Sequence, residues 1–156
     1  MFFIPFIFAQ TVHAAPQNLF PALSGALQDD ASTIWTNPAN LAFAPKSSRI
    51  SAAQFSEQSN SFGFARQLGI LSTGAIYNND ENLGNWWSIA SGLSLKLDDN
   101  LSFGTTSTWH SLDSENTNFV SWDIGLGYRP LQWLGFGVSF NNLGSNSPHL
   151  DEKLRL

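Results

Sequence analysis

The stretch VSWDIGLGY, residues 120–128, decides the fold class, because a large apolar side chain occupies every second position in it. The residues between them are small or polar. Strict alternation with a period of two over this length predicts a β-strand with one apolar face. The apolar face consists of Val120, Trp122, Ile124, Leu126 and Tyr128, and the other face of Ser121, Asp123, Gly125 and Gly127.

The same period recurs from Arg49 onward, and it predicts six further strands. The connections between them alternate between short turns and longer loops rich in asparagine. This rhythm is typical of an antiparallel up-and-down meander with all its short turns at one end. The predicted strands are 49–56, 61–66, 70–77, 87–97, 101–110 and 134–140, the short turns 66–69, 98–100 and 129–132, and the longer loops 78–85 and 112–118.

Composition limits the classes of function. The chain has 156 residues, enough for one ordinary domain, and no cysteine, so disulfides and cysteine-based metal sites are excluded. Charged residues make up 12% of the chain, about half of the ~25% of an ordinary soluble domain. The net charge is −5, with only seven Lys and Arg. A nucleic-acid partner is therefore not expected, because phosphate neutralisation needs a basic patch.

The second face of the predicted strands indicates which solvent the apolar face meets. Alternation alone fits a soluble β-sandwich, a soluble barrel or a transmembrane barrel. A water-facing sheet surface usually collects Lys, Glu and Thr, whereas this face carries Gly, Ser, Thr and Ala, with Asp123 as its one acidic residue. Small polar residues suit a confined lumen, and in a bilayer only a closed barrel pairs all strand backbone groups. The pattern favours a transmembrane β-barrel.

Aromatic residues lie near the ends of the predicted strands. Transmembrane barrels carry girdles of aromatic side chains at both membrane interfaces. We therefore predict an aromatic girdle and a lipid bilayer as the partner of the apolar face. The predicted girdle residues are Trp86, Trp87, Trp109, Phe119, Tyr128 and Trp133.

Residues 1–14 are predicted to be a signal peptide. Phe2 to Ala9 form an apolar run, and small residues allow cleavage after Ala14. The run is preceded by no Lys or Arg, which departs from the usual pattern, and a buried N-terminal strand is the alternative. Export together with a barrel predicts the bacterial outer membrane as the location.

Residues 15–48 differ from the meander of 49–156, because they show no alternation. They are rich in Ala, Leu, Pro and Asn, and they suit a short helical segment. Asn37-Pro38 is expected to end the element before it, since proline disfavours helical geometry in the preceding residue.

Within this segment, DDASTIWTNPANLA, residues 29–42, resembles the N-terminal segment of the FadL-like outer-membrane proteins, which include fatty-acid and hydrocarbon transporters and the related PorV-type proteins. Asn40 stands where that family usually has glycine. The resemblance implies a plug that lies inside the lumen ahead of the first strand, and transport of hydrophobic small molecules. The matching residues are Asp30, Ala31, Asn37, Pro38, Ala39 and Leu41.

Barrels of this family have more strands than the seven predicted here. Residues 153–156 look like the beginning of an eighth strand. Because single-chain bacterial barrels have even strand numbers from 8 upward, we expect a truncated chain that forms an incomplete barrel of about seven or eight strands, or an open curved sheet.

Two alternatives to a transporter remain. The hairpin GYRPLQWLGFGVSFNNLG, residues 127–144, resembles those of the same family, but similar hairpins occur in barrel-like domains joined to serine proteases. The chain could therefore be a non-catalytic membrane scaffold for a partner or a downstream protease. A soluble β-domain is the other alternative.

No constellation of catalytic residues emerges from the sequence. His13, His110 and His149 have no partners at metal-ligand spacing, and no Gly-x-Ser-x-Gly motif occurs. The glycine pairs 125/127 and 135/137 lie within predicted strands, where they indicate small lumen-facing positions. We expect no enzyme activity, no cofactor and no metal site.

Overall fold

The computed structural model describes residues 19, 27–57, 59–81, 84–113 and 117–144. The predicted signal peptide, much of the segment 15–26 and the predicted start of an eighth strand lie outside the described residues. The described part contains two 3-10 helices, η2 (Ala31–Trp35) and η3 (Pro38–Ala42), and seven strands. The strands are β1 (Ser47–Phe55), β2 (Ser59–Leu68), β3 (Leu71–Asp80), β4 (Gly84–Lys96), β5 (Leu101–Leu112), β6 (Thr117–Leu131) and β7 (Leu134–Leu143).

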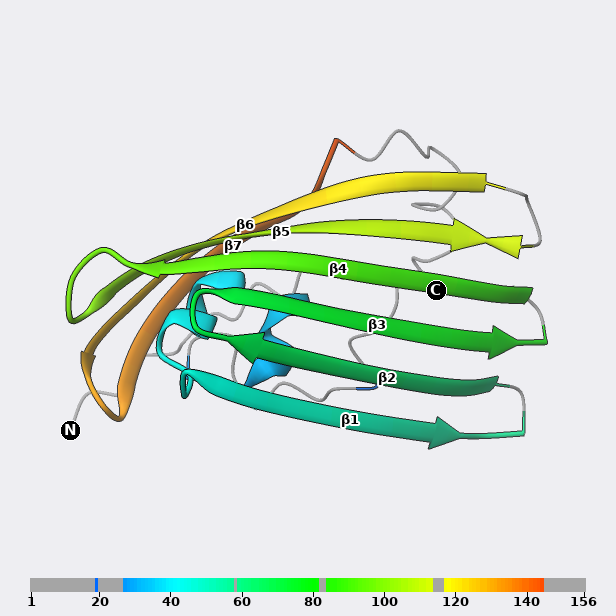
Figure 1. Cartoon of the computed structure of the whole chain (residues 1–156), viewed down its shortest axis with the longest axis horizontal. Coiled ribbons are helices and arrows are strands. Elements are labelled where there is room, and N and C mark those ends of the chain that lie inside the picture. The colour runs from blue at the N-terminus through cyan, green and yellow to red at the C-terminus, as the bar shows by residue number, and fades with distance from the viewer. Residues whose placement is uncertain (1–18, 20–26, 58, 82–83, 114–116, 145–156) are drawn as a thin grey trace, which may run out of the picture.

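The seven strands form one antiparallel sheet in the order β1-β2-β3-β4-β5-β6-β7. Each strand pairs with its neighbours in the sequence, so the prediction of an all-β, up-and-down meander is confirmed. Figure 1 shows the turns β2–β3, β4–β5 and β6–β7 at one end of the sheet and the other three connections at the opposite end.

The strands are longer than predicted, and the loops are correspondingly shorter. The predicted loop 78–85 contracts, because Asn78 pairs with Trp86 and Asn79 with Asn85 in the β3–β4 ladder. β6 is likewise longer at both ends than the predicted strand 120–128, and it spans Thr117–Leu131. Asparagine-rich sequence suggested loops here, but pairing with an already formed neighbour strand overrides that local preference.

The sheet is strongly curved, and it is not closed into a barrel. β1 and β7 are its two edges, and neither pairs with the other. In Figure 1, β7 passes behind the front strands, and η2 and η3 lie on the concave side. η2 contacts β1 to β4, while η3 contacts β4 to β6. We call the concave side the inner face and the convex side the outer face.

The two faces differ sharply in what they carry. Along β5 the inner-face residues Ser102, Gly104, Thr106 and Thr108 are small and buried, whereas Trp109 on the outer face is exposed. The apolar core is small. One cluster consists of Ala31, Ile34 and Leu41 from the 3-10 segment packed on Ala65 and Ala90 of the sheet, and a second consists of Leu19 and Ile76.

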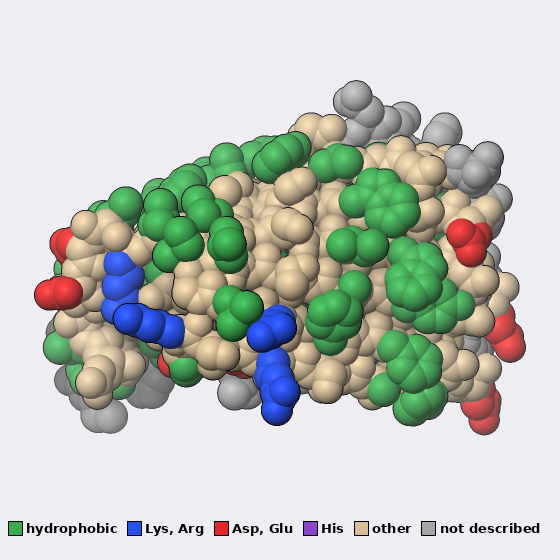
Figure 2. Space-filling view, viewed as in Figure 1, with side chains coloured by type: hydrophobic (Ala, Val, Ile, Leu, Met, Phe, Trp, Pro, Cys, Tyr) green, Lys and Arg blue, Asp and Glu red, His purple; other side chains and the backbone are tan. Residues whose placement is uncertain are grey.

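The large apolar side chains predicted along the strands lie on the outer face with much of their surface exposed. Trp122 is 50% exposed and Phe140 60% exposed. Figure 2 shows hydrophobic side chains spread over this face. Within the described segments, neither helix has the length and apolar character that crossing a membrane would require.

Candidate functional site

The segment that covers the inner face begins with a capped 3-10 helix. The Asp30 side chain accepts a hydrogen bond from the Ser32 backbone N–H at 2.7 Å and another from the Ser32 hydroxyl. The Thr33 hydroxyl donates to the Asp30 carbonyl at 2.9 Å. Aspartate at this position satisfies N–H groups that the helix itself leaves without partners. The DAST sequence therefore begins η2 at Ala31.

Asn37-Pro38 separates η2 from η3. Asn37 has extended backbone angles (φ −145°, ψ 99°), as expected for a residue before proline. Its side-chain oxygen accepts from the Ala39 N–H at 3.1 Å, so Asn37 caps η3, and Pro38 occupies the first turn. Asn40 is fully buried within η3. Asn142 is the one described non-glycine residue with positive φ, so Asn40 needs no left-handed backbone.

Glycines of the inner face form the seat for η3. A Cβ at Gly104 would collide with the carbonyl group of Pro38 and the backbone nitrogen of Ala39. A Cβ at Gly125 would collide with the Asn37 side-chain oxygen. The Asn37 amide also donates to the Leu126 carbonyl at 3.3 Å. Glycine is therefore required at 104 because the Pro38–Ala39 backbone approaches the sheet more closely than any side chain would allow, and at 125 because the Asn37 side chain occupies that space.

Polar side chains of the first two strands anchor the rest of the segment. Gln67 is almost fully buried, and its amide donates to the Leu41 carbonyl at 2.6 Å and to the Gly69 carbonyl at 3.0 Å. The Ser48 hydroxyl accepts from the Ala31 N–H at 3.0 Å. These bonds satisfy backbone groups that would otherwise be buried without partners.

Basic side chains hold the segment at the short-turn end of the sheet. Arg129 donates to the Gln28 carbonyl at 2.8 Å and lies 3.8 Å from the Asp29 carboxylate. The guanidinium carbon lies 4.6 Å from the centre of the Phe43 ring, and the Lys96 ammonium lies 5.4 Å from it. Both distances are in the range of cation–π contacts.

All six residues that match the predicted plug motif lie in this segment. Asp30 and Asn37 act as caps, while Ala31, Pro38, Ala39 and Leu41 are buried. The structure thus brings the motif together on the inner face, against β1 to β6.

The predicted girdle residues do not share one face. Trp87, Trp109, Tyr128 and Trp133 are between 40% and 72% exposed. Trp86 and Phe119 are half-buried, and each alternates with the exposed residue next to it in its strand. The Phe119 ring stacks on the His110 ring with centroids 4.6 Å apart. Trp86 and Phe119 therefore follow the inner face.

His110 belongs to a polar network on the inner face. Its Nδ1 lies 2.8 Å from the Ser88 hydroxyl and its Nε2 lies 3.0 Å from the Ser121 hydroxyl. Both serines are buried, and both ring nitrogens are thus occupied. The arrangement orders three strands and provides no acid to orient the histidine as a base in a nucleophilic triad.

Across the described ranges, no three His, Asp or Glu side chains are grouped closely enough to hold a metal ion.

The sequence predicts Gly125 as a small inward position, but it does not predict the roles of Gly104 and Gln67. Gly104 lies in a strand with a weak pattern, and the sequence places Gln67 in a turn. Only the register of β2 and β5 against the segment reveals their roles. The one signal that the sequence offers for Gln67 is its place in the alternation, which puts this glutamine, two residues before Gly69, on the inner face.

Comparison with protein-family models, with curated proteins and with solved structures finds no match for this chain. The resemblance of residues 29–42 to the FadL-like proteins therefore stays a prediction.

Proposed function

We propose that this chain contributes a wall of a bacterial outer-membrane β-barrel, with η2 and η3 as a plug inside it, and that the barrel serves FadL-like transport of hydrophobic compounds. One observation carries the proposal. Most large apolar side chains of the strands point away from the plug segment and are exposed, while the strand side chains that the segment covers are mostly small or polar.

The extent of the exposed apolar surface supports a lipid environment. Exposed aromatic and aliphatic residues occur on the outer face of all seven strands. Monomeric soluble proteins rarely expose contiguous apolar patches larger than a few hundred Å². Lipid tails cover such a face without a second protein layer, which the described residues do not provide.

Outer-face hydroxyl groups also suit an apolar solvent. The Thr73 hydroxyl donates to the Ala90 carbonyl at 3.1 Å, and the Thr105 hydroxyl donates to the Asp123 carbonyl at 3.0 Å. Both bonds reach across to the neighbouring strand. A hydroxyl that is bonded to the sheet can face lipid at lower cost than one that needs water.

The open edges of the sheet fit a wall that further strands complete. In a bilayer, the free N–H and C=O groups of β1 and β7 need partners, and barrel closure supplies them. The class of transported compound rests on the resemblance of residues 29–42. The tight seat of η3 indicates that a solute would have to displace the plug or pass beside it.

Fractionation of a bacterium that expresses the full chain tests the proposal. We expect the protein in the outer-membrane fraction, extracted only by detergent, with a gel mobility that changes on heating. Recovery from the soluble fraction as a monodisperse protein without detergent would contradict the membrane proposal and favour a soluble β-domain.

A further inference from the structure

Two arginines face each other on the outer face of β1 and β2. Arg49 and Arg66 are register partners, and both side chains are exposed. Like charges directly opposite each other destabilise a strand pair. Neither guanidinium has a hydrogen bond or an ion pair with another described residue. The pair therefore presents two sets of unused donors at one place.

The surroundings of the arginine pair supply no counter-charge. The outer-face positions of β1 to β4 hold apolar residues, Ser, Thr and Asn, and no acidic residue among those described. Figure 2 shows this basic patch between hydrophobic side chains. Two adjacent guanidinium groups match the geometry of a phosphate, which can accept paired hydrogen bonds from each. The pair is thus complementary to a bound anion.

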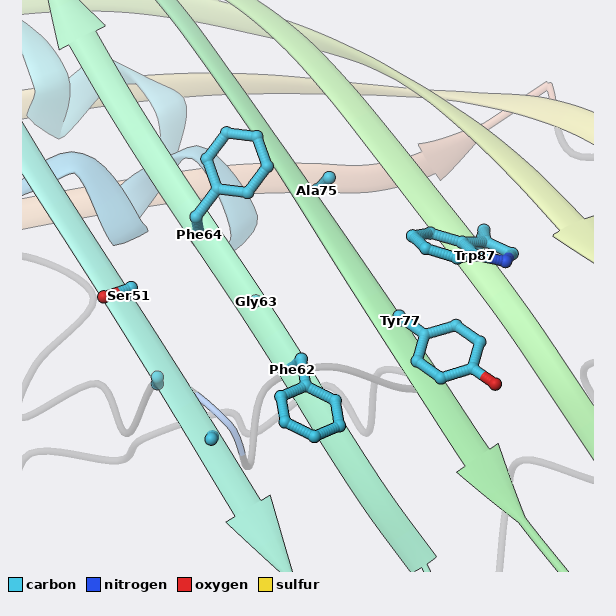
Figure 3. Close-up of a pocket in the computed structure, with 9 residues that line it drawn as sticks. Ser51, Phe62, Gly63, Phe64, Ala75, Tyr77 and Trp87 are labelled. Carbon is cyan, nitrogen blue, oxygen red and sulfur yellow. The ribbon is translucent and has the colours of Figure 1, made fainter.

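An apolar groove begins beside the pair. It has a volume of about 640 Å³, within the range of 300–1,000 Å³ typical of small-molecule sites. Small residues form its floor, including Ser51, Gly63 and Ala75. Figure 3 shows the aromatic rings that stand around this floor. They belong to Phe62, Phe64, Tyr77 and Trp87.

The groove begins at the outer-face pair next to the arginine pair. Ser51 follows Arg49 by two residues on the same face, and Phe64 precedes Arg66 by two. Two strand residues span about 7 Å, so the cationic end and the groove lie within reach of one amphiphile. At the far side, the Tyr77 and Trp87 rings pack with centroids 4.5 Å apart. The groove therefore runs from the arginines toward the loop end of the sheet.

We propose that this surface binds one anionic phospholipid, with its phosphate between Arg49 and Arg66 and an acyl chain in the groove. The inference rests on the proposed membrane function. Arg66 lies three residues before Gly69 in the β2–β3 turn, about 10 Å along the strand. This places the phosphate near the short-turn end, where a headgroup belongs, and directs the acyl chain toward the middle of the sheet. A free phosphate would leave the apolar groove unused.

Tryptophan quenching by brominated short-chain lipids in solution tests the site on the full chain. Brominated dihexanoyl phosphatidylglycerol is compared with the matching phosphatidylcholine, and Trp87→Phe identifies the part of the signal that comes from the groove. We expect tighter binding of phosphatidylglycerol, and binding at least tenfold weaker in R49Q/R66Q. R49K/R66K, which keeps the charge but loses the paired donors, is expected to lie between the two. Lys46→Gln removes a nearby exposed cation outside this face and is expected to change nothing.

Filling the groove separates a phospholipid from a free anion. Ala75→Phe is expected to weaken phospholipid binding and to leave binding of inorganic phosphate unchanged. Three results would overturn the inference. They are equal binding of both lipids, an unchanged affinity in R49Q/R66Q, and an affinity for the lipid that Ala75→Phe leaves unchanged. Flotation with neutral vesicles reports the membrane function separately: a chain that inserts but shows no lipid preference refutes only the phospholipid site.

Discussion

The inner and outer faces of this sheet come from the same strands, yet they follow opposite rules. On the inner face, Gly104 is needed because the Pro38–Ala39 backbone packs directly on it, and Gly125 because the Asn37 side chain packs directly on it. On the outer face, Trp122 and Phe140 are large, apolar and exposed. A water-soluble sheet would bury the large residues and expose the small polar ones. The inversion teaches that burial in this chain depends on closeness of approach more than on hydrophobicity.

A charge on the outer face should have the largest effect, if lipid covers that face. Ile124→Arg is expected to destabilise the protein in vesicles by about 2–4 kcal/mol, the cost of a cation near the bilayer midplane. The urea dependence of folding into phosphatidylcholine vesicles measures it. Ile124→Leu is the matched control and should be nearly neutral. A loss below about 0.5 kcal/mol for Ile124→Arg would be typical of a water-exposed surface position.

A methyl group on the inner face gives the next largest effect, and its size depends on what it meets. At Gly104 the new Cβ meets the Pro38–Ala39 backbone, which cannot move aside. Gly104→Ala should therefore cost about 1–3 kcal/mol through overpacking and expose the segment 29–42 to protease. At Gly92 the Cβ meets the Ser72 and Thr106 hydroxyls, which can rotate, and lies 3.3 Å from the Thr105 carbonyl oxygen. Gly92→Ala should therefore lower the free energy of unfolding less than Gly104→Ala, and equal losses at both sites would refute this account of the η3 seat.

Removing the Asn37 side chain should have a moderate effect. Asn37→Ala loses the cap of η3 and the bond to the Leu126 carbonyl, and the cap alone is worth about 1 kcal/mol. Asn37→Ser keeps a neutral capping oxygen but not the amide donor, so it should lose less than Asn37→Ala. Denaturant unfolding monitored by tryptophan fluorescence compares the two, and a larger loss in Asn37→Ser would contradict the assigned cap.

The smallest effect is expected at Thr73 on the outer face. Thr73→Val removes one hydroxyl, but its partner, the Ala90 carbonyl, belongs to the β-sheet. In vesicles the change in stability should stay below about 0.5 kcal/mol, since the lost hydrogen bond is offset by the more apolar side chain. Repeating the measurement with Thr105→Val, whose hydroxyl bonds the Asp123 carbonyl in the same way, provides the matched comparison.

Much of the fold could be predicted because the period of two extends over whole strands. VSWDIGLGY was recognised as a strand, and it lies at the centre of β6. The loop lengths were wrong, because the asparagines at 78, 79 and 85 form ladder pairs that only a neighbouring strand provides. Alternation could also have separated Trp86 from Trp87, since adjacent strand residues point to opposite faces.

The site was less predictable than the fold. The caps at Asp30 and Asn37 follow from local sequence, because aspartate and asparagine accept from the N–H groups that open a helix. The seat at Gly104 does not follow from local sequence, since it depends on which part of β5 lies under Pro38. The pairing of Arg49 with Arg66 likewise follows from the β1–β2 register, which the sequence alone leaves open.

The central claim is that lipid covers the apolar row of β6. The chain has no cysteine, so single cysteines at positions 120 to 128 can each carry one spin label on the full-length protein in membranes. Collision with oxygen and with a water-soluble nickel complex then reports the surroundings of each label. The account predicts that labels at 122, 124 and 126 are accessible to oxygen and protected from the nickel complex. Labels at 121, 123 and 125 are expected to show the opposite accessibility or the spectrum of an immobilised label. Nickel access at 122, 124 and 126 would contradict it.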